Sequence, residues 1–146
     1  MKVIIQRVSQ ASVTIDNEVV SNINQGVLIL LGIAENDTLE QIKWLTNKII
    51  NLRIFNDNDG KMNLSLKDIK GEAIVVSQFT LLANTKKGTR PSYIKAAKPE
   101  IAIPLYEQFI KQFETDFNKK IGTGVFGADM KVALVNDGPV TIVLER

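Results

Sequence analysis

The chain has 146 residues, of which 45% are hydrophobic and 23% are charged, and its formal net charge is +2 at pH 7. These values are typical of a soluble globular protein, and the length predicts a single domain over residues 1–146. The chain contains no cysteine and no histidine, which excludes disulfides, thiolate nucleophiles, cysteine-ligated zinc and a Ser-His-Asp relay. No metal and no cofactor is expected.

Membrane and export signals are not found in the sequence. The longest apolar stretch, Val27–Ala34, is interrupted by Gly32 and is far too short to cross a bilayer. Near the N-terminus, Gln6 and Arg7 interrupt the apolar run too early for the core of a signal peptide. The expected location is therefore the cytoplasm, with no membrane partner.

The first third of the chain predicts β structure. Val13 and Ile15 alternate with Thr14 and Asp16, which is the two-residue period of a half-buried strand. Polar turn residues separate this run from the next apolar ones. Residues 27–33 are almost all apolar, as expected of a central strand that is covered on both faces.

A helical pattern begins at Asp37. This aspartate, with Glu40 three positions later, matches a capping box in which aspartate takes the place of serine or threonine. Apolar residues then recur at three- and four-residue spacing, at Ile42, Leu45, Ile49 and Leu52. The sequence therefore predicts an amphipathic helix, and the polar stretch 55–63 after it predicts a loop.

The rest of the chain predicts a strand, a second helix and two closing strands. The stretch EAIVVSQFTLL is typical of a buried strand, and the helix begins at Pro99, with Pro104 near enough to its start to be tolerated. MKVALV and VTIVLE predict two separate strands. The expected fold class is α/β, with a mixed sheet and two packed helices. The apolar positions of the second helix are Ala102, Leu105, Tyr106, Phe109, Phe113 and Phe117.

Two stretches imitate ligand-binding motifs. GTGVFG matches the dinucleotide fingerprint, but a helix precedes it and a strand follows it, so a glycine-rich connection is favoured. FNDNDGKMNLSL imitates a calcium loop, but Phe55 and Leu66 occupy the positions of the anchoring carboxylates. Asp57 and Asp59 are instead expected to bond their own backbone in a turn.

Three further stretches have both an ordinary and a functional interpretation. SQFTL, residues 77–81, is either a half-buried strand end or a wall that directs N–H and O–H groups into a pocket. The basic stretch 86–98 is either a solvated loop or a patch that contacts phosphates. Gly138–Pro139 is either a turn that opens the last strand or a motif with a function of its own.

The ordered set of motifs resembles one known family. SQFTL, KKGTRPSY, FGADM and NDGPVT, in this order and at these separations, closely resemble the D-aminoacyl-tRNA deacylases, also called D-tyrosyl-tRNA deacylases. IQRVSQASVTID and RIFNDNDGKMN are similar to the same family, so the resemblance covers essentially the whole chain. The resemblance implies a β-rich, barrel-like fold and a homodimer with active sites at the subunit interface.

The implied reaction is hydrolysis of the ester that joins a D-amino acid to the terminal adenosine of tRNA. Mischarged glycyl-tRNA would also be accepted, and L-aminoacyl-tRNA would be spared. By the same resemblance, Ser77, Gln78, Phe79 and Thr80 would line the pocket, and the N–H groups of Phe79 and Thr80 would stabilise the oxyanion. The resemblance also offers Thr80 as a nucleophile. Because the chain has no histidine to activate its hydroxyl, the ribose 2′-hydroxyl is the favoured assistant in catalysis.

The resemblance also assigns roles outside this pocket. Gly138 and Pro139, joined by a cis bond in the family, would reach into the partner's pocket and exclude L side chains. Arg7 would support this motif. Phe126 and Met130 would hold the terminal adenine, and the tRNA backbone would contact Lys86, Lys87 and Arg90.

Two other functions are compatible with the residues themselves. A non-catalytic RNA-binding module would explain the basic stretch and the missing histidine without a pocket. A small-molecule binding or interaction protein would use the last strand only as an interface. Release of a D-amino acid from charged tRNA distinguishes the hydrolase from both.

Overall fold

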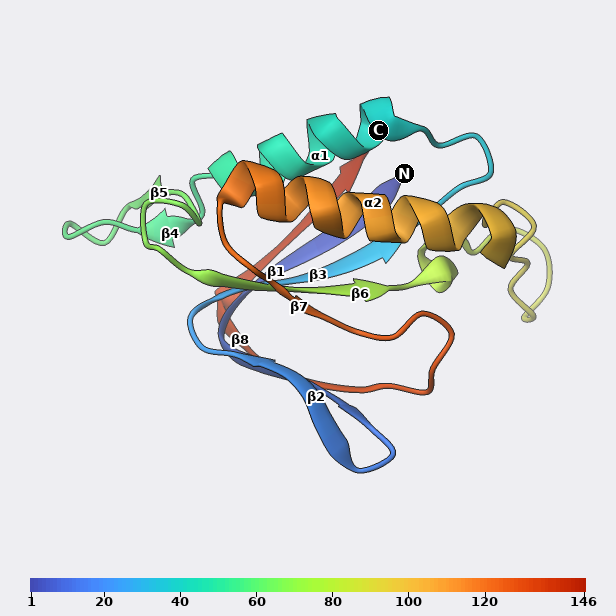
Figure 1. Ribbon diagram of the computed structural model, residues 1–146, viewed down its shortest axis with the longest axis horizontal. Helices are drawn as coiled ribbons and strands as arrows, with labels where there is room; N and C mark the ends of the chain where they lie inside the picture. The colour runs from blue at the N-terminus through green and yellow to red at the C-terminus, as the bar shows by residue number, and fades with distance from the viewer.

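The computed structural model describes all residues from Met1 to Arg146. Its two α-helices lie on one face of a strongly curved sheet, and the other side of the sheet curls back on itself (Figure 1). The sheet is mixed and nearly closed, so the predicted fold class is confirmed. The elements in chain order are β1 (Lys2–Ile15), β2 (Glu18–Ile23), β3 (Gly26–Gly32), α1 (Leu39–Asn51), β4 (Phe55–Asn56), β5 (Met62–Leu64), β6 (Glu72–Ser77), the 3₁₀ helix η1 (Phe79–Leu82), α2 (Pro99–Phe117), β7 (Gly122–Thr123) and β8 (Lys131–Glu145).

The long strand β1 organises the sheet. Its first half pairs with β3 and its second half with β2, both antiparallel, while β8 runs antiparallel to it along nearly its whole length. Beyond β3, the strands β6 and β7 are added in parallel, giving the order β2-β1-β3-β6-β7. This arrangement places the carboxyl ends of β3 and β6 side by side, where the chain leaves the sheet.

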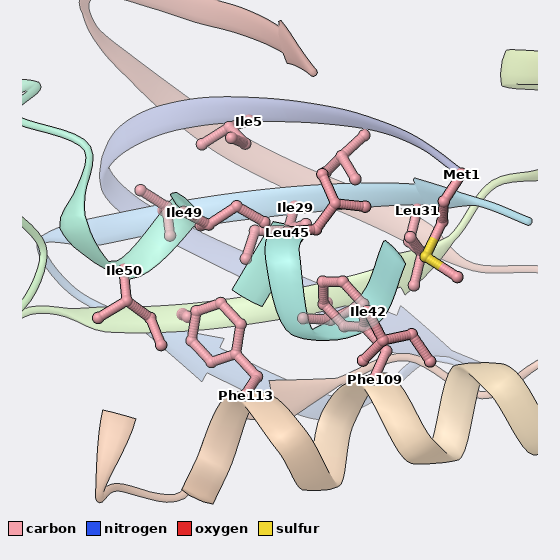
Figure 2. Close-up of a cluster of buried hydrophobic side chains, with 14 of the residues drawn as sticks. Met1, Ile5, Ile29, Leu31, Ile42, Leu45, Ile49, Ile50, Phe109 and Phe113 are labelled. Atoms are coloured by element: carbon pink, nitrogen blue, oxygen red, sulfur yellow. The ribbon is translucent and has the colours of Figure 1, made fainter. Parts of the chain in front are cut away.

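Side chains of the central strands alternate between two hydrophobic cores. On β3, Val27, Ile29 and Leu31 face the helices, whereas Leu28 faces the inside of the curl. Figure 2 shows the larger core, in which Ile42 of α1 and Phe109 of α2 meet the sheet. Because every residue of 27–29 is buried, the predicted two-sided central strand is confirmed.

The first helix begins one residue later than predicted, and the predicted capping pair is wrong. Thr38 is the N-cap, and its hydroxyl accepts a hydrogen bond from the Glu40 N–H, while the Gln41 side chain accepts from the Thr38 N–H. Asp37 instead accepts from the Ala34 N–H at 2.7 Å and pairs with the Met1 ammonium group. The sequence offers two overlapping cap patterns, and the tertiary contacts of Asp37 decide between them.

Three other predicted boundaries need correction. The predicted loop at 55–63 contains a small hairpin, in which β4 pairs with β5. The predicted strand over residues 72–82 ends at Ser77, and a 3₁₀ turn follows. The two predicted closing strands form one continuous strand, β8. The helix from Pro99 is confirmed, with Pro104 inside it. Neither helix is long and apolar enough to cross a membrane.

Candidate functional site

A pocket lies where the chain leaves β3 and β6. Its volume is about 290 Å³, and ten of its thirteen lining residues are hydrophobic. The walls come from the two strand ends, the start of η1, the N-terminal region of α2 and the loop between β7 and β8, which reach the same end of the molecule (Figure 1). The lining residues are Leu31, Ile33, Val76, Ser77, Gln78, Phe79, Ala97, Ala102, Phe126, Gly127, Ala128, Met130 and Val132.

Most of the predicted pocket residues lie together here. Ser77, Gln78 and Phe79 form one wall, and Phe126 and Met130 come from the loop after β7. None of the lining residues is ionisable, and the only polar side chains among them are those of Ser77 and Gln78. The pocket therefore offers an apolar enclosure with a few directed polar groups, which is the usual composition of a small-molecule site.

The chain turns sharply at the wall that carries Ser77. The Gln78 N–H still donates to the Leu31 carbonyl of β3 at 2.8 Å, which fixes the point where the turn begins. The first bond of η1 runs from the Leu81 N–H to the Gln78 carbonyl. The N–H groups of Phe79 and Thr80 precede that bond, so no carbonyl of η1 is available to them.

Thr80 lies next to the pocket and is not part of its lining. Its hydroxyl oxygen accepts a hydrogen bond from the Gln78 side-chain amide. In this bond the Thr80 hydroxyl oxygen faces a hydrogen-bond donor, and a donor cannot remove the hydroxyl proton. The arrangement therefore gives the Thr80 hydroxyl no activating partner within the chain.

The opposite wall depends on two residues that the sequence analysis did not assign to the site. A Cβ on Gly124 would lie only 2.5 Å from the Met130 sulfur, so glycine is required for Met130 to pack there. The Tyr106 hydroxyl donates to the Val75 carbonyl at 2.8 Å and the Gly124 carbonyl at 3.4 Å. Burial raises the pKa of this hydroxyl to about 12, so it remains a donor.

Tyr106 also packs against Phe126, with ring centroids 6.1 Å apart. The helical periodicity had placed this residue in the core, and the structure confirms that it is buried. The periodicity carries no information about its second role, which is to connect α2 with β6 and the loop after β7. Only a map of three-dimensional contacts reveals that connection.

Gly138 and Pro139 occupy a bulge in β8. Gln6 is opposite Thr141 and Val8 is opposite Asn136, so a two-residue step on β1 faces a five-residue step on β8. We call residues 137–140 the β8 bulge. The peptide bond between Gly138 and Pro139 is cis, and both residues are exposed. Neither belongs to the lining of the pocket.

The Arg7 side chain forms hydrogen bonds that connect the β8 bulge to other elements. Its side chain is buried, and its Nε donates to the Asp137 carbonyl at 2.9 Å. One terminal nitrogen donates to the Ile54 carbonyl at 2.7 Å and to the Asn56 side chain at 3.3 Å. The guanidinium group thus joins β1, the β8 bulge and the β4–β5 hairpin. Arg7 contacts the β8 bulge through the Asp137 carbonyl and lies outside the pocket lining.

The three residues that were predicted to contact the tRNA backbone lie on an exposed hairpin-like loop. Asn84 and Ser92 exchange two hydrogen bonds, of 2.8 and 3.0 Å, which close the base of this loop. Lys86, Lys87 and Arg90 lie between them and are exposed. We call residues 85–91 the basic tip. It belongs to the segment that follows η1, beside the pocket wall, at the right of Figure 1.

Asp57 has the role in the turn that the sequence predicted. One of its carboxylate oxygens accepts from the N–H groups of Asp59 and Lys61, both at 3.0 Å. The other accepts from the Asn63 side chain at 2.6 Å. These bonds, led by that of Asn63, lower the pKa of Asp57. The turn closes the hairpin whose first strand carries the Arg7 partner Asn56.

Solved structures share this whole arrangement. The chain is similar to one described as a c-Myc DNA unwinding element binding protein, with a TM-score of 0.95 and 42% identity over 100% of this chain and 99% of that one. A probable eukaryotic D-amino acid tRNA deacylase has the same fold at 15% identity, with a TM-score of 0.85 over 98% of this chain and 97% of that one.

Curated relatives carry the comparison from fold to activity. D-aminoacyl-tRNA deacylases of Flavobacterium psychrophilum and Flavobacterium johnsoniae are 68% and 63% identical, over 99% of this chain and 97% of each relative. The protein is therefore an enzyme, and its class is that of the hydrolases. The family model described as D-Tyr-tRNA(Tyr) deacylase matches residues 4–145. The chain belongs to that family.

Proposed function

We propose that this enzyme hydrolyses the ester between a D-amino acid and the terminal adenosine of tRNA. The observation that carries the proposal is the pocket, in which the wall of Ser77, Gln78 and Phe79 faces Phe126 and Met130 with no ionisable group between them. The aromatic ring and the thioether suit a flat adenine base. The opposite wall then receives the ester, and a tRNA substrate implies work in the cytoplasm.

The polar groups at this wall suit the charge that forms during ester hydrolysis. Attack of water places a negative charge on the former carbonyl oxygen. The N–H groups of Phe79 and Thr80, which precede the first bond of η1, are the donors that we assign to it. Fixed donors aimed at such a charge contribute on the order of 3 kcal/mol each to transition-state stabilisation.

The proton of the attacking water needs an acceptor that the pocket does not provide. Its lining contains no carboxylate and no amine, and the chain has no histidine. Thr80 is already engaged by Gln78. We therefore assign the assisting role to the ribose 2′-hydroxyl beside the ester: its oxygen accepts the proton of the attacking water while its own proton passes to the departing ribose oxygen. Catalysis of this kind needs no cofactor.

We assign the rejection of L-amino acids to the β8 bulge of a partner subunit in a homodimer. Gly138 and Pro139 are exposed on a braced bulge and are absent from the pocket of their own chain. In the partner's pocket, their main-chain carbonyls would accept hydrogen bonds from the substrate's α-amino group. A hydrogen atom or a D side chain then fits, whereas an L side chain meets the wall. Glycyl-tRNA passes the same filter.

The first experiment compares matched charged tRNAs. We expect release of the D-amino acid and of glycine, and an intact ester with the L-amino acid. A terminal 2′-deoxyadenosine should slow hydrolysis of the D-substrate far more than Thr80→Ala does. Equal rates with normal and deoxy substrate would contradict the role of the 2′-hydroxyl, and tRNA binding without any hydrolysis would identify a binding module instead.

The second experiment tests the partner's contribution with mixed dimers. Ala128→Trp fills the pocket of one protomer, and Gly138→Ala distorts the bulge of the other; two affinity tags isolate the mixed species. The one open pocket then receives an intact bulge from the other protomer. We expect the mixed dimer to reject L-aminoacyl-tRNA, as the wild type does. Hydrolysis of the L-substrate at the rate of Gly138→Ala dimers would show that each pocket uses its own bulge.

A further inference from the structure

Two aromatic rings at the rim of the pocket remain open to solvent. The rings of Phe79 and Tyr93 meet edge to face, with centroids 5.0 Å apart and an interplanar angle of 72°. Phe79 is 54% exposed and Tyr93 is 38% exposed. Isolated exposed apolar residues are common, but an ordered pair beside a pocket presents a surface for a flat ligand. We call these two residues the aromatic pair.

The chain on both sides of Tyr93 is tied to the body of the protein. Ser92, immediately before it, is bonded to Asn84 in both directions. A few residues later, the Ala97 N–H donates to the Ile33 carbonyl at 2.9 Å. The ring of Tyr93 is thus held against Phe79 before any ligand arrives, so little conformational entropy is lost when a ligand binds there.

Positive charge continues outward from the aromatic pair. The basic tip exposes Lys86, Lys87 and Arg90, and no aspartate or glutamate occurs between residues 73 and 99. The order from the interior outward is therefore the pocket, the ring of Phe79 at its rim, the ring of Tyr93 and then the cationic loop. A chain of bases with a phosphate backbone has the matching chemistry, because its bases stack and its phosphates are anionic.

We propose that the aromatic pair is a stacking platform for the unpaired nucleotides that precede the terminal adenosine of the tRNA. This inference rests on the proposed function, because it assumes that the adenosine occupies the pocket. The strand leaves the pocket over Phe79, a preceding base stacks on Tyr93, and the phosphates meet the basic tip. Stacking of this kind tolerates any base, so the platform serves every tRNA alike.

The test compares a long and a short substrate that carry the same D-amino acid. D-aminoacyl-tRNA contains the preceding nucleotides, whereas D-aminoacyl-adenosine does not. We expect Tyr93→Ala to lower the ratio of kcat/KM for the long substrate to that for the short one by about fivefold or more. Tyr93→Phe should restore the ratio because it keeps the ring. Ile94→Ala, at a residue that is 85% exposed and outside the aromatic pair, is the matched control and should not change the ratio.

Salt dependence separates stacking from charge. Lys86→Ala combined with Lys87→Ala should flatten the dependence of KM for tRNA on salt concentration, whereas Tyr93→Ala should raise KM and keep the slope. A short RNA that carries no amino acid can hold 2-aminopurine at the position before the terminal adenosine. We expect the wild type to quench the 2-aminopurine fluorescence and Tyr93→Ala to quench it less.

Two outcomes would overturn the proposal. If the wild type hydrolyses both substrates and Tyr93→Ala leaves their ratio unchanged, the platform is wrong and the proposed function stands. If the wild type hydrolyses neither substrate, both are wrong.

Discussion

Ten of the thirteen residues that line the pocket are hydrophobic, whereas the β8 bulge exposes Gly138 and Pro139 to solvent. The pocket is assembled from strand ends, a helix and a loop that pack on one another. The bulge inserts extra residues into one strand, and hydrogen bonds from the buried Arg7 guanidinium group and to the Asn136 side chain hold it. The lining of the pocket contains no acid or base, and the bulge offers exposed main chain that is not part of that lining.

We expect the two regions to perform separate tasks, substrate binding and stereochemical selection. In the proposed function, the pocket holds the end of the RNA and stabilises the oxyanion, whereas the partner's bulge distinguishes the two hands of the amino acid. The bulge presents carbonyl groups in a fixed place, as a stereochemical filter requires. If the two regions act separately, substitutions in the bulge should change the ratio of D to L hydrolysis, and substitutions around the pocket should change binding of the adenosine.

Removing the support of the bulge should have the largest effect. Arg7→Ala leaves the Asp137 and Ile54 carbonyls without their charged donor, and we expect the free energy of unfolding to fall by about 3 kcal/mol. The ratio of D to L hydrolysis should fall by about tenfold or more. Urea denaturation and paired deacylation assays measure the two effects. Arg7→Lys should recover only part of the ratio, because an ammonium group cannot reproduce the planar fork.

The second largest effect should come from a substitution that crowds the bulge. A Cβ on Gly138 would lie 2.8 Å from an Arg7 nitrogen and 2.9 Å from a Val140 methyl group, at a φ of +129°. Gly138→Ala should therefore cost about 1–3 kcal/mol of stability and lower the D-to-L ratio. Gly60→Ala is the matched control, since Gly60 has a φ of +76° with no neighbour within 4 Å. A loss of D-to-L discrimination in both variants would point to general softening rather than to the bulge.

These residues also show what the sequence could and could not predict. The central strand at 27–33 and the helix from Pro99 follow from local periodicity, so both were predictable. The single strand β8 was not, because a proline in its middle normally ends a ladder. Its continuity depends on β1, which pairs on both sides of the bulge. The motifs predicted several residues that lie at the pocket, such as Ser77 and Phe126, but also Thr80, which is not part of its lining. The contacts of Gly124 and Tyr106 join distant elements and could not be predicted from local sequence.

On the pocket side, Tyr106→Phe should have a moderate effect that leaves the bulge untouched. The variant keeps the ring against Phe126 and loses the bonds to the Val75 and Gly124 carbonyls. We expect a loss of about 1 kcal/mol in stability and a higher KM for D-aminoacyl-adenosine, with the D-to-L ratio unchanged. A fall in that ratio would contradict the separation of the two regions.

The Tyr106 hydroxyl also predicts a dependence on alkaline pH. Desolvation raises its pKa from 10.0 to about 12 in the folded protein. The stability that this shift contributes is fully present below pH 10 and is lost as the pH rises toward 12. The difference in stability between the wild type and Tyr106→Phe should therefore be constant up to about pH 10 and decrease above it. Unfolding curves at several pH values measure this difference.

The smallest effect should come from the turn that closes the β4–β5 hairpin. The Asn63 side chain, followed by backbone N–H groups, lowers the pKa of Asp57 below its ordinary value of 3.8. A lowered carboxyl pKa stabilises the fold above that ordinary value, and the contribution is lost as the pH falls through the folded pKa. Asp57→Asn exchanges the oxygen that accepts from Asn63 for a donor, so we expect a slightly less stable protein at pH 7.

The same variant connects the turn with the bulge, because the hairpin holds Asn56 against Arg7. The stability difference between the wild type and Asp57→Asn should shrink as the pH is lowered through the folded pKa of Asp57, since the wild type then loses the same charge. The D-to-L ratio at pH 7 should fall only slightly, because the Ile54 and Asp137 carbonyls still fix the guanidinium group. A fall as large as that of Arg7→Ala would show that the hairpin, rather than the arginine, sets the position of the bulge.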